Sequence, residues 1–254
     1  MLRGLLSTPT VLRMSTGLKK RVLVAGLPGM GLVAKQVADY IVEVFNAKLV
    51  KRLHLVDLYP SLAFFSNGLL TPLDSKSFYR FYRKELNGVD LLVFTGDLQP
   101  STAEGQHKLA NEVIREVERE GVETVYTVAA YPVRSYTRDP QVYCVSNSVE
   151  LLKELEGLGI PRLREDTTIS GVNGLLAEYA NRVGMKAACL LVETSIINGR
   201  DLRAAIAILK KLSIILGVEI DTERLEEEAI KFEEVVRGYA EKFIGWEEKG
   251  VSYI

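Results

Sequence analysis

Cysteine and histidine are scarce in this sequence. Its 254 residues include two cysteines, Cys144 and Cys189, and two histidines, His54 and His107. The cysteines lie in apolar runs that predict buried strands, and the histidines lie far apart with no cysteine or histidine beside them. A disulfide framework or a zinc-type site needs more of these residues at closer spacing. We therefore expect two reduced core thiols, no bound metal and a cytoplasmic protein.

Excess charge and long apolar runs are also absent. With 32 basic and 33 acidic residues the net charge is -1, which gives no electrostatic reason to bind nucleic acid or an anionic membrane. No apolar run is long enough to span a bilayer. The sequence has neither a Gly-x-Ser-x-Gly nucleophile turn nor the Lys-Ser/Thr of a P-loop. We expect no catalytic residue and no cofactor.

Residues 1–18 have a composition of their own. They carry two arginines, no acidic residue and several hydroxyl side chains, which loosely resembles a transit peptide. A second methionine, Met14, is an alternative start, in which case Met1 is an upstream start codon. We favour a disordered leader or an upstream start codon over a transit peptide, and the apolar core of a secretory signal is missing.

A glycine-rich turn is the first distinctive feature that the sequence does contain. Gly26-Leu27-Pro28-Gly29-Met30-Gly31 joins an apolar strand to an amphipathic helix that begins near Leu32. Such a turn permits close backbone approach and leaves N–H groups at a helix N-terminus, where phosphate can bind. The spacing differs from the dinucleotide pattern Gly-x-Gly-x-x-Gly. We therefore expect a tight strand-to-helix turn that packs against Asn173-Gly174 or a neighbouring subunit.

Strand and helix patterns alternate from residue 19 to residue 198. The predicted strands are residues 21–25, 48–58, 89–95, 123–130, 142–145 and 186–194, with amphipathic segments between them. Ser101 and Glu104 predict a capping box at the start of a helix that runs to about Glu120. This alternation predicts a three-layer α/β/α sandwich with a mostly parallel sheet.

Residues 61–88 are less regular and rich in aromatic side chains. We interpret them as a loop followed by a β-hairpin arm. Aromatic side chains bury a large area at low entropic cost, so this arm can serve as an interface. A flap that covers the core of the same domain is the alternative.

Polar residues follow several predicted strands, at the edge where open α/β sheets bind ligands. Asp97 and Glu193 stand near two strand ends, and the segment that contains Gly171, Asn173 and Gly174 precedes a helix. The two carboxylates could bind a sugar, an amine or magnesium, or they could cap the helices that follow. Because no base, nucleophile or metal ligand lies beside them, we favour capping.

Two amphipathic helices end the chain. Residues 199–245 predict a helical hairpin that packs on the core or on a neighbouring subunit, and residues 246–254 predict a flexible tail. The second helix carries apolar residues at alternating spacings of four and three: Leu225, Ala229, Phe232, Val236, Tyr239 and Phe243. This is a heptad seam, too short for a free coiled coil.

Three blocks carry a family resemblance. In chain order they are Gly-Leu-Pro-Gly-Met-Gly-Leu-Val-Ala at 26–34, Thr-Gly-Asp-Leu-Gln-Pro at 95–100 and Ile-Ser-Gly-Val-Asn-Gly-Leu-Leu at 169–176. The strand that ends in Glu193-Thr194-Ser195 follows them. They resemble the proteasome assembly chaperone family of the second type, particularly its archaeal single-domain members. The resemblance implies a fold similar to purine nucleoside phosphorylases, a homo-oligomer, and an ATP-independent, non-enzymatic chaperone for the 20S proteasome.

The resemblance also assigns a role to the C-terminus. Members often end in a hydrophobic-Tyr-any tail whose tyrosine and terminal carboxylate dock between proteasome α-subunits. This chain ends in Ser252-Tyr253-Ile254, so the tyrosine fits and Ser252 occupies the hydrophobic place. A frayed terminus without a partner is the alternative.

Two other functions stay open at this stage. One is an enzyme or sensor, ATP-grasp-like or phosphorylase-like, that binds a nucleoside or phosphate ligand near Gly29, Asp97 and Asn173. The other is an oligomeric scaffold whose partner is not the proteasome.

Overall fold

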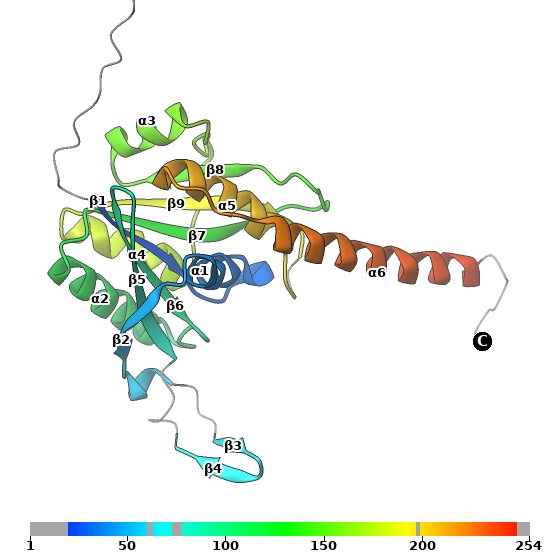
Figure 1. The fold of residues 1–254 in the computed structure, drawn as a ribbon, viewed down its shortest axis with the longest axis horizontal. Coiled ribbons are helices and arrows are strands. Elements are labelled where there is room, and N and C mark those ends of the chain that lie inside the picture. The colour runs from blue at the N-terminus through cyan, green and yellow to red at the C-terminus, as the bar shows by residue number, and fades with distance from the viewer. Residues whose placement is uncertain (1–19, 60–62, 73–77, 197–198, 248–254) are drawn as a thin grey trace, which may run out of the picture.

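A seven-stranded sheet forms the centre of the protein. The structure, a computed structural model, describes residues 20–59, 63–72, 78–196 and 199–247 (Figure 1). The sheet has the order β2-β5-β6-β1-β7-β9-β8. Its strands are β1 (Lys20–Gly26), β2 (Lys48–Leu53), β5 (Tyr79–Leu86), β6 (Val89–Gly96), β7 (Thr124–Pro132), β8 (Val142–Ser146) and β9 (Lys186–Thr194). Only β5 and β8 run against the other five, so the sheet is mostly parallel.

Helices cover both faces of this sheet, as predicted. One face packs against α1 (Val33–Val44), α3 (Val149–Gly157) and α5 (Leu202–Leu216), and the other against α2 (Ala103–Arg119) and α4 (Val172–Arg182). Because successive side chains of a strand point to opposite faces, β1 contributes Val22 and Val24 to one core and Leu23 and Ala25 to the other. The predicted α/β/α sandwich is confirmed.

Several predicted boundaries are wrong. The strand expected over 48–58 ends at Leu53, and a short 3₁₀ helix, η2 (Val56–Leu58), follows. The N-cap of α2 is Thr102 rather than Ser101, since the Thr102 hydroxyl accepts from the Gly105 N–H at 3.1 Å. These differences arise because local patterns do not specify where pairing partners end.

Residues 61–88 divide into two different structures. A small antiparallel hairpin, β3 (Phe64–Ser66) and β4 (Leu69–Thr71), projects from the body (Figure 1). Its turn residues Asn67 and Gly68 both have positive φ, which suits a two-residue hairpin turn. The later part, expected in the arm, is instead β5, which pairs with β2 and β6 inside the main sheet.

The last helix, α6 (Glu223–Glu247), begins on the body and extends away from it (Figure 1). It forms an antiparallel hairpin with α5, and it runs two residues beyond the predicted stop near Gly245. Residues 1–19 and the tail residues 248–254 lie outside the described part of the chain, so the predicted leader and tail cannot be compared with it. Within the described residues, no helix is long and apolar enough to cross a membrane.

Candidate functional site

The glycine-rich turn after β1 is clamped by two amide side chains. Buried Asn173, near the start of α4, accepts from the Leu27 N–H at 3.1 Å and donates to the Leu27 carbonyl at 3.2 Å. Gln99, just after β6, donates to the Pro28 carbonyl at 2.5 Å and accepts from the Val172 N–H at 2.8 Å. Three distant segments therefore meet at the carboxyl end of the central strand.

Two glycines of this turn are required by its geometry. A Cβ on Gly26 would lie 2.0 Å from the Ala34 carbonyl oxygen, so only glycine lets β1 approach α1 this closely. Gly31 lies within the short 3₁₀ helix η1 (Met30–Leu32) and has a φ of +61°. By contrast, Gly29 has an extended φ of -157° and no atom within 4 Å of its Cβ position. Gly29 therefore borders open space.

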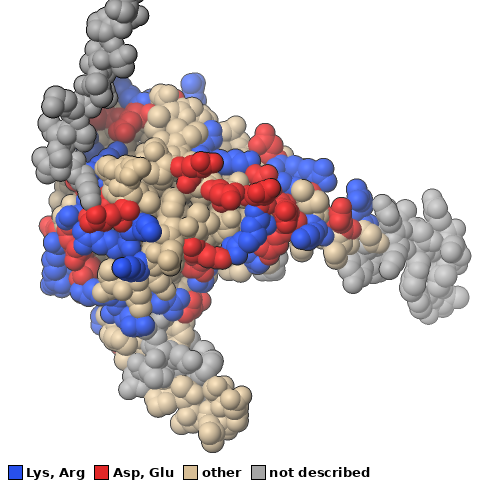
Figure 2. All heavy atoms as spheres, viewed as in Figure 1, with Lys and Arg blue, Asp and Glu red and all other residues tan. Residues whose placement is uncertain are grey.

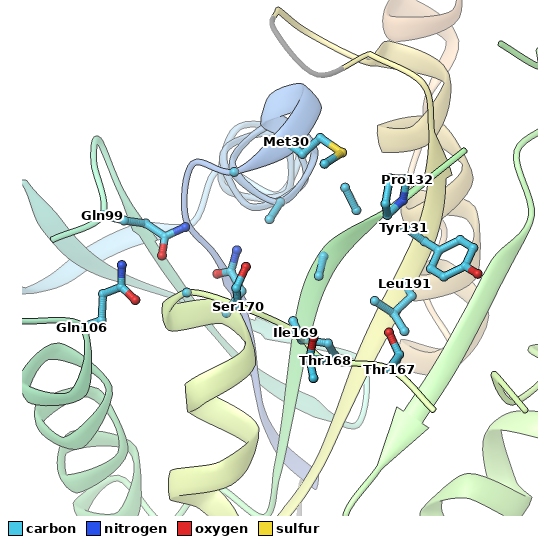
Figure 3. Close-up of a pocket in the computed structure, with 16 residues that line it drawn as sticks. Met30, Gln99, Gln106, Tyr131, Pro132, Thr167, Thr168, Ile169, Ser170 and Leu191 are labelled. Atoms are coloured by element: carbon cyan, nitrogen blue, oxygen red, sulfur yellow. The ribbon is translucent and has the colours of Figure 1, made fainter. Parts of the chain in front are cut away.

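That open space is a cleft of ≈ 590 Å³ above the ends of β1, β7 and β9 (Figure 3). Of the predicted site residues, it brings together Gly29, Gly171 and Asn173. The other lining residues are Met30, Ala34, Gln99, Gln106, Ala129, Ala130, Tyr131, Pro132, Thr167, Thr168, Ile169, Ser170 and Leu191. None of these residues carries an ionisable acid or base other than the Tyr131 phenol. Gly174, one residue beyond Asn173, packs against the Ile169 carbonyl instead of lining the cleft.

Asp97 does not line the cleft but belongs to an ion-pair cluster beside it. Arg80 of β5 holds both of its carboxylate oxygens, at 2.8 and 2.6 Å, and Lys35 lies at 3.4 Å. Burial alone would raise the pKa of Asp97, but hydrogen bonds from Arg80 and the charges of Arg80 and Lys35 hold that pKa below its usual value. Asp97 is therefore an ionised structural anchor.

Glu193 also lies outside the cleft. Its carboxylate accepts from the Gln141 N–H at 3.0 Å and from the Tyr143 hydroxyl at 3.4 Å. Glu193 thus ties the end of β9 to the edge strand β8. Asp97 and Glu193, which the sequence places at strand ends, occupy separate networks, and neither caps the following helix.

A second polar network, around Asp201, was not predicted from the sequence. Asp201, almost fully buried, caps α5 by accepting from the Ala204 N–H at 3.0 Å and also accepts from the Thr194 hydroxyl. The Asp201 N–H donates to the Gly31 carbonyl at 2.8 Å. The N-cap pattern before α5 could have identified Asp201, but its link to the glycine turn spans 170 residues of sequence and is invisible to local patterns.

The two cysteines lie in the core and do not form a reactive site. Cys144 and Cys189 are free and buried, and burial raises the pKa of the first thiol to about 11 and of the second to about 12. Both therefore stay protonated and unreactive near neutral pH. Among the described residues, no group of three or more His, Cys, Asp or Glu side chains is arranged to hold a metal ion.

The sequence from residue 23 to residue 240 matches the PAC2 family. The chain belongs to the PAC2 family. The match includes the glycine turn, the cleft and most of α6, and it confirms the resemblance drawn from the three sequence blocks.

This PAC2 protein is similar to two solved structures and to one further protein over most of their lengths. PbaB of Pyrococcus furiosus, described as an archaeal proteasome activator, is 26% identical with a TM-score of 0.77, over 88% of this chain and 95% of PbaB. PbaA of the same organism, described as an archaeal homolog of proteasome-assembly chaperone, is 26% identical with a TM-score of 0.71, over 91% and 92%. An uncharacterized protein of Methanocaldococcus jannaschii is 28% identical over 86% of this chain and 83% of its own.

Proposed function

We propose that this PAC2 protein is a non-enzymatic, ATP-independent assembly factor of the 20S proteasome that binds α-subunits through Ser252-Tyr253-Ile254. The observation that carries the proposal is the similarity to PbaB and PbaA, which extends over almost the whole of those two chains. One of them is described as a proteasome activator and the other as a homolog of a proteasome-assembly chaperone. The cleft is neutral, and Asp97 and Glu193 are each engaged in a separate structural network outside it, so neither observation supports an acid–base enzyme.

The position of α6 supports a role for the tail. This helix carries the chain outward from the body as far as Glu247, seven residues before the C-terminus (Figure 1). A short peptide that must enter a pocket on a large partner needs such a projection, because the globular body would otherwise collide with the partner.

An exposed apolar face on α6 supports homo-oligomer formation. Leu225 and Ala229 are buried against the body, but further along the helix Phe232 and Val236 are each 50% exposed and Val235 is 56% exposed. The same heptad seam therefore starts in the core of one chain and continues into solvent. Burying that continuation against α6 of another copy would stabilise a helix that is marginal alone. Several tails would then be displayed together.

The tail can be tested by gain as well as loss of affinity. Binding of the full chain to isolated 20S α-rings is measured by surface plasmon resonance, together with three variants. Deletion of residues 252–254 should abolish binding. Ser252→Leu restores the hydrophobic place and should tighten binding at least tenfold, because burying a leucine side chain contributes about 1.5–3 kcal/mol. Ser252→Asn is the control and should leave the affinity unchanged.

Other outcomes would separate the alternatives. Full binding by the deleted chain would remove the tail from the mechanism while keeping the proteasome as partner. No binding by the intact chain would overturn the proteasome role and leave the scaffold with a different partner.

A further inference from the structure

We propose that the cleft beside Gly29 binds a small uncharged ligand of the nucleobase or nucleoside class, independently of any proteasome role. Its lining includes Gly29 from the connection after β1 and Gln99 from the connection after β6, and these two connections lead to α1 and α2 on opposite faces of the sheet. Open α/β sheets form their ligand crevices at such switch points. The volume of ≈ 590 Å³ lies within the range of small-molecule sites, about 300–1,000 Å³.

The chemistry of the lining favours an uncharged ligand over an anionic one. The cleft is lined by no lysine, arginine or histidine of the described chain, so a phosphate would have no cation to compensate its burial. The N-terminus of α4 cannot take that role at its first N–H, because the Val172 N–H already donates to the Gln99 side chain. A nucleotide therefore fits the cleft less well than the nucleoside that it contains.

The remaining lining matches a flat ring with a polar edge. Ala34, Ala129 and Ala130 offer small apolar side chains that leave room for a ring. Thr168 and Ser170 also line the cleft, and both are exposed, so their hydroxyl groups are available to a ligand. A hydroxyl both donates and accepts hydrogen bonds, as the edge of a nucleobase requires. An apolar surface with a few convergent neutral polar groups is the usual composition of a site for an uncharged ligand.

Gly29 permits a test that leaves the fold intact. Its extended φ is available to any residue, and a Cβ there would meet no atom within 4 Å. Gly29→Val should therefore fill the cleft without strain. Gly157, at the end of α3 and outside the cleft, also has open space around its Cβ position. Gly157→Val is the matched control.

Isothermal titration calorimetry of the full chain tests the proposal. The ligands are adenosine, guanosine, cytidine and uridine, the corresponding monophosphates, and inorganic phosphate. We expect saturable binding of at least one nucleoside, at least tenfold weaker binding of its monophosphate, and a loss of at least tenfold in Gly29→Val but not in Gly157→Val. The proposal is overturned if no nucleoside binds at millimolar concentration, if the monophosphate binds more tightly, or if Gly29→Val binds normally. A cooperative melting transition near that of the natural chain shows that each variant is folded.

Discussion

At the scale of single residues, the turn after β1 depends on close backbone packing and on specific hydrogen bonds. Asn173 satisfies both main-chain groups of Leu27, and each would cost about 1–3 kcal/mol if left buried without a partner. The spacing of glycines predicted a close approach at this turn. Asn173-Gly174 was one of the two packing partners predicted for the turn, and Asn173 is found there. The clamp by Gln99 was not predicted, because Gln99 and Val172 lie 73 residues apart and meet only through the order of the strands.

Gly26 and Gly29 should therefore respond differently to the same substitution. Gly26→Ala places a methyl group against the Ala34 carbonyl and should destabilise the fold by about 3 kcal/mol or more, the upper range for overpacking. Gly29→Ala should change the free energy of unfolding by less than about 0.5 kcal/mol, as for ordinary surface sites. Urea denaturation followed by circular dichroism measures both. Equal stability of the two variants would contradict the close approach of β1 to α1.

At the scale of elements, the carboxylate of Glu233, in the third turn of α6, is one of the groups that attach this helix to the body. Glu233 accepts from Arg203 Nε at 2.7 Å and from the Tyr136 hydroxyl at 2.7 Å, and it pairs with Arg138 at 3.0 Å. The Arg203 hydrogen bond is the main reason that the pKa of Glu233 falls to about 2. Burial and the same carboxylate raise the pKa of Tyr136 to about 12.

This attachment should be lost in acid. Because the pKa of Glu233 is lower in the folded state than in the unfolded state, its contribution is complete above about pH 4.5 and declines as the pH falls toward about 2. Glu233→Gln should therefore lower the melting temperature at pH 7, and the difference from the natural chain should shrink toward pH 2. Scanning calorimetry at several pH values measures this. Glu234→Gln, at an exposed neighbouring position, is the control, and a pH-independent difference would refute the assignment.

The elements that the sequence predicted well are those whose local pattern agrees with their surroundings. β6 has a continuous apolar run because both of its faces are buried. β5 was not predicted as a strand of the main sheet, since Arg80 stands between buried Tyr79 and Phe81 and Arg83 follows on the same side as these two. The charges of the two arginines are compensated by Asp97 and by Asp90 of β6. The partners that compensate these charges are brought close only by the tertiary structure, so local sequence does not show them. The hairpin tip was better marked, by Asn67-Gly68.

At the scale of the whole molecule, two apolar regions of the described part of the chain stand out as exposed on a surface of mixed charge. Figure 2 shows acidic and basic side chains over the body and the start of α6, whereas the tip of the β3–β4 hairpin carries only uncharged residues. On that tip, Phe65, Leu69 and Leu70 are 61%, 74% and 65% exposed. The second region is the face of α6 that contains Phe232 and Val236. Exposed apolar regions of this kind mark interaction surfaces.

Disrupting the α6 face should separate the copies and weaken proteasome binding together. The double variant Phe232→Glu with Val236→Glu introduces charge into the heptad seam, so light scattering after size exclusion should give the mass of a single chain. Binding to an α-ring should weaken roughly 10²-fold or more as avidity is lost. The control variant Glu227→Gln with Lys231→Gln removes the exposed pair at 3.8 Å on the same helix and should keep both properties. A single-chain mass for the natural protein would refute self-association.

The length of the projecting part of α6 also fixes how far the tail starts from the body. From Val236 to Glu247 the helix rises roughly 17 Å at about 1.5 Å per residue. Removing four residues, about one turn, would draw the attachment point of the tail inward by about 6 Å and rotate it by about 40°. In an oligomer, the length of α6 therefore sets the distance of the tails from the symmetry axis. That distance must equal the radius at which the pockets of a ring-shaped partner lie.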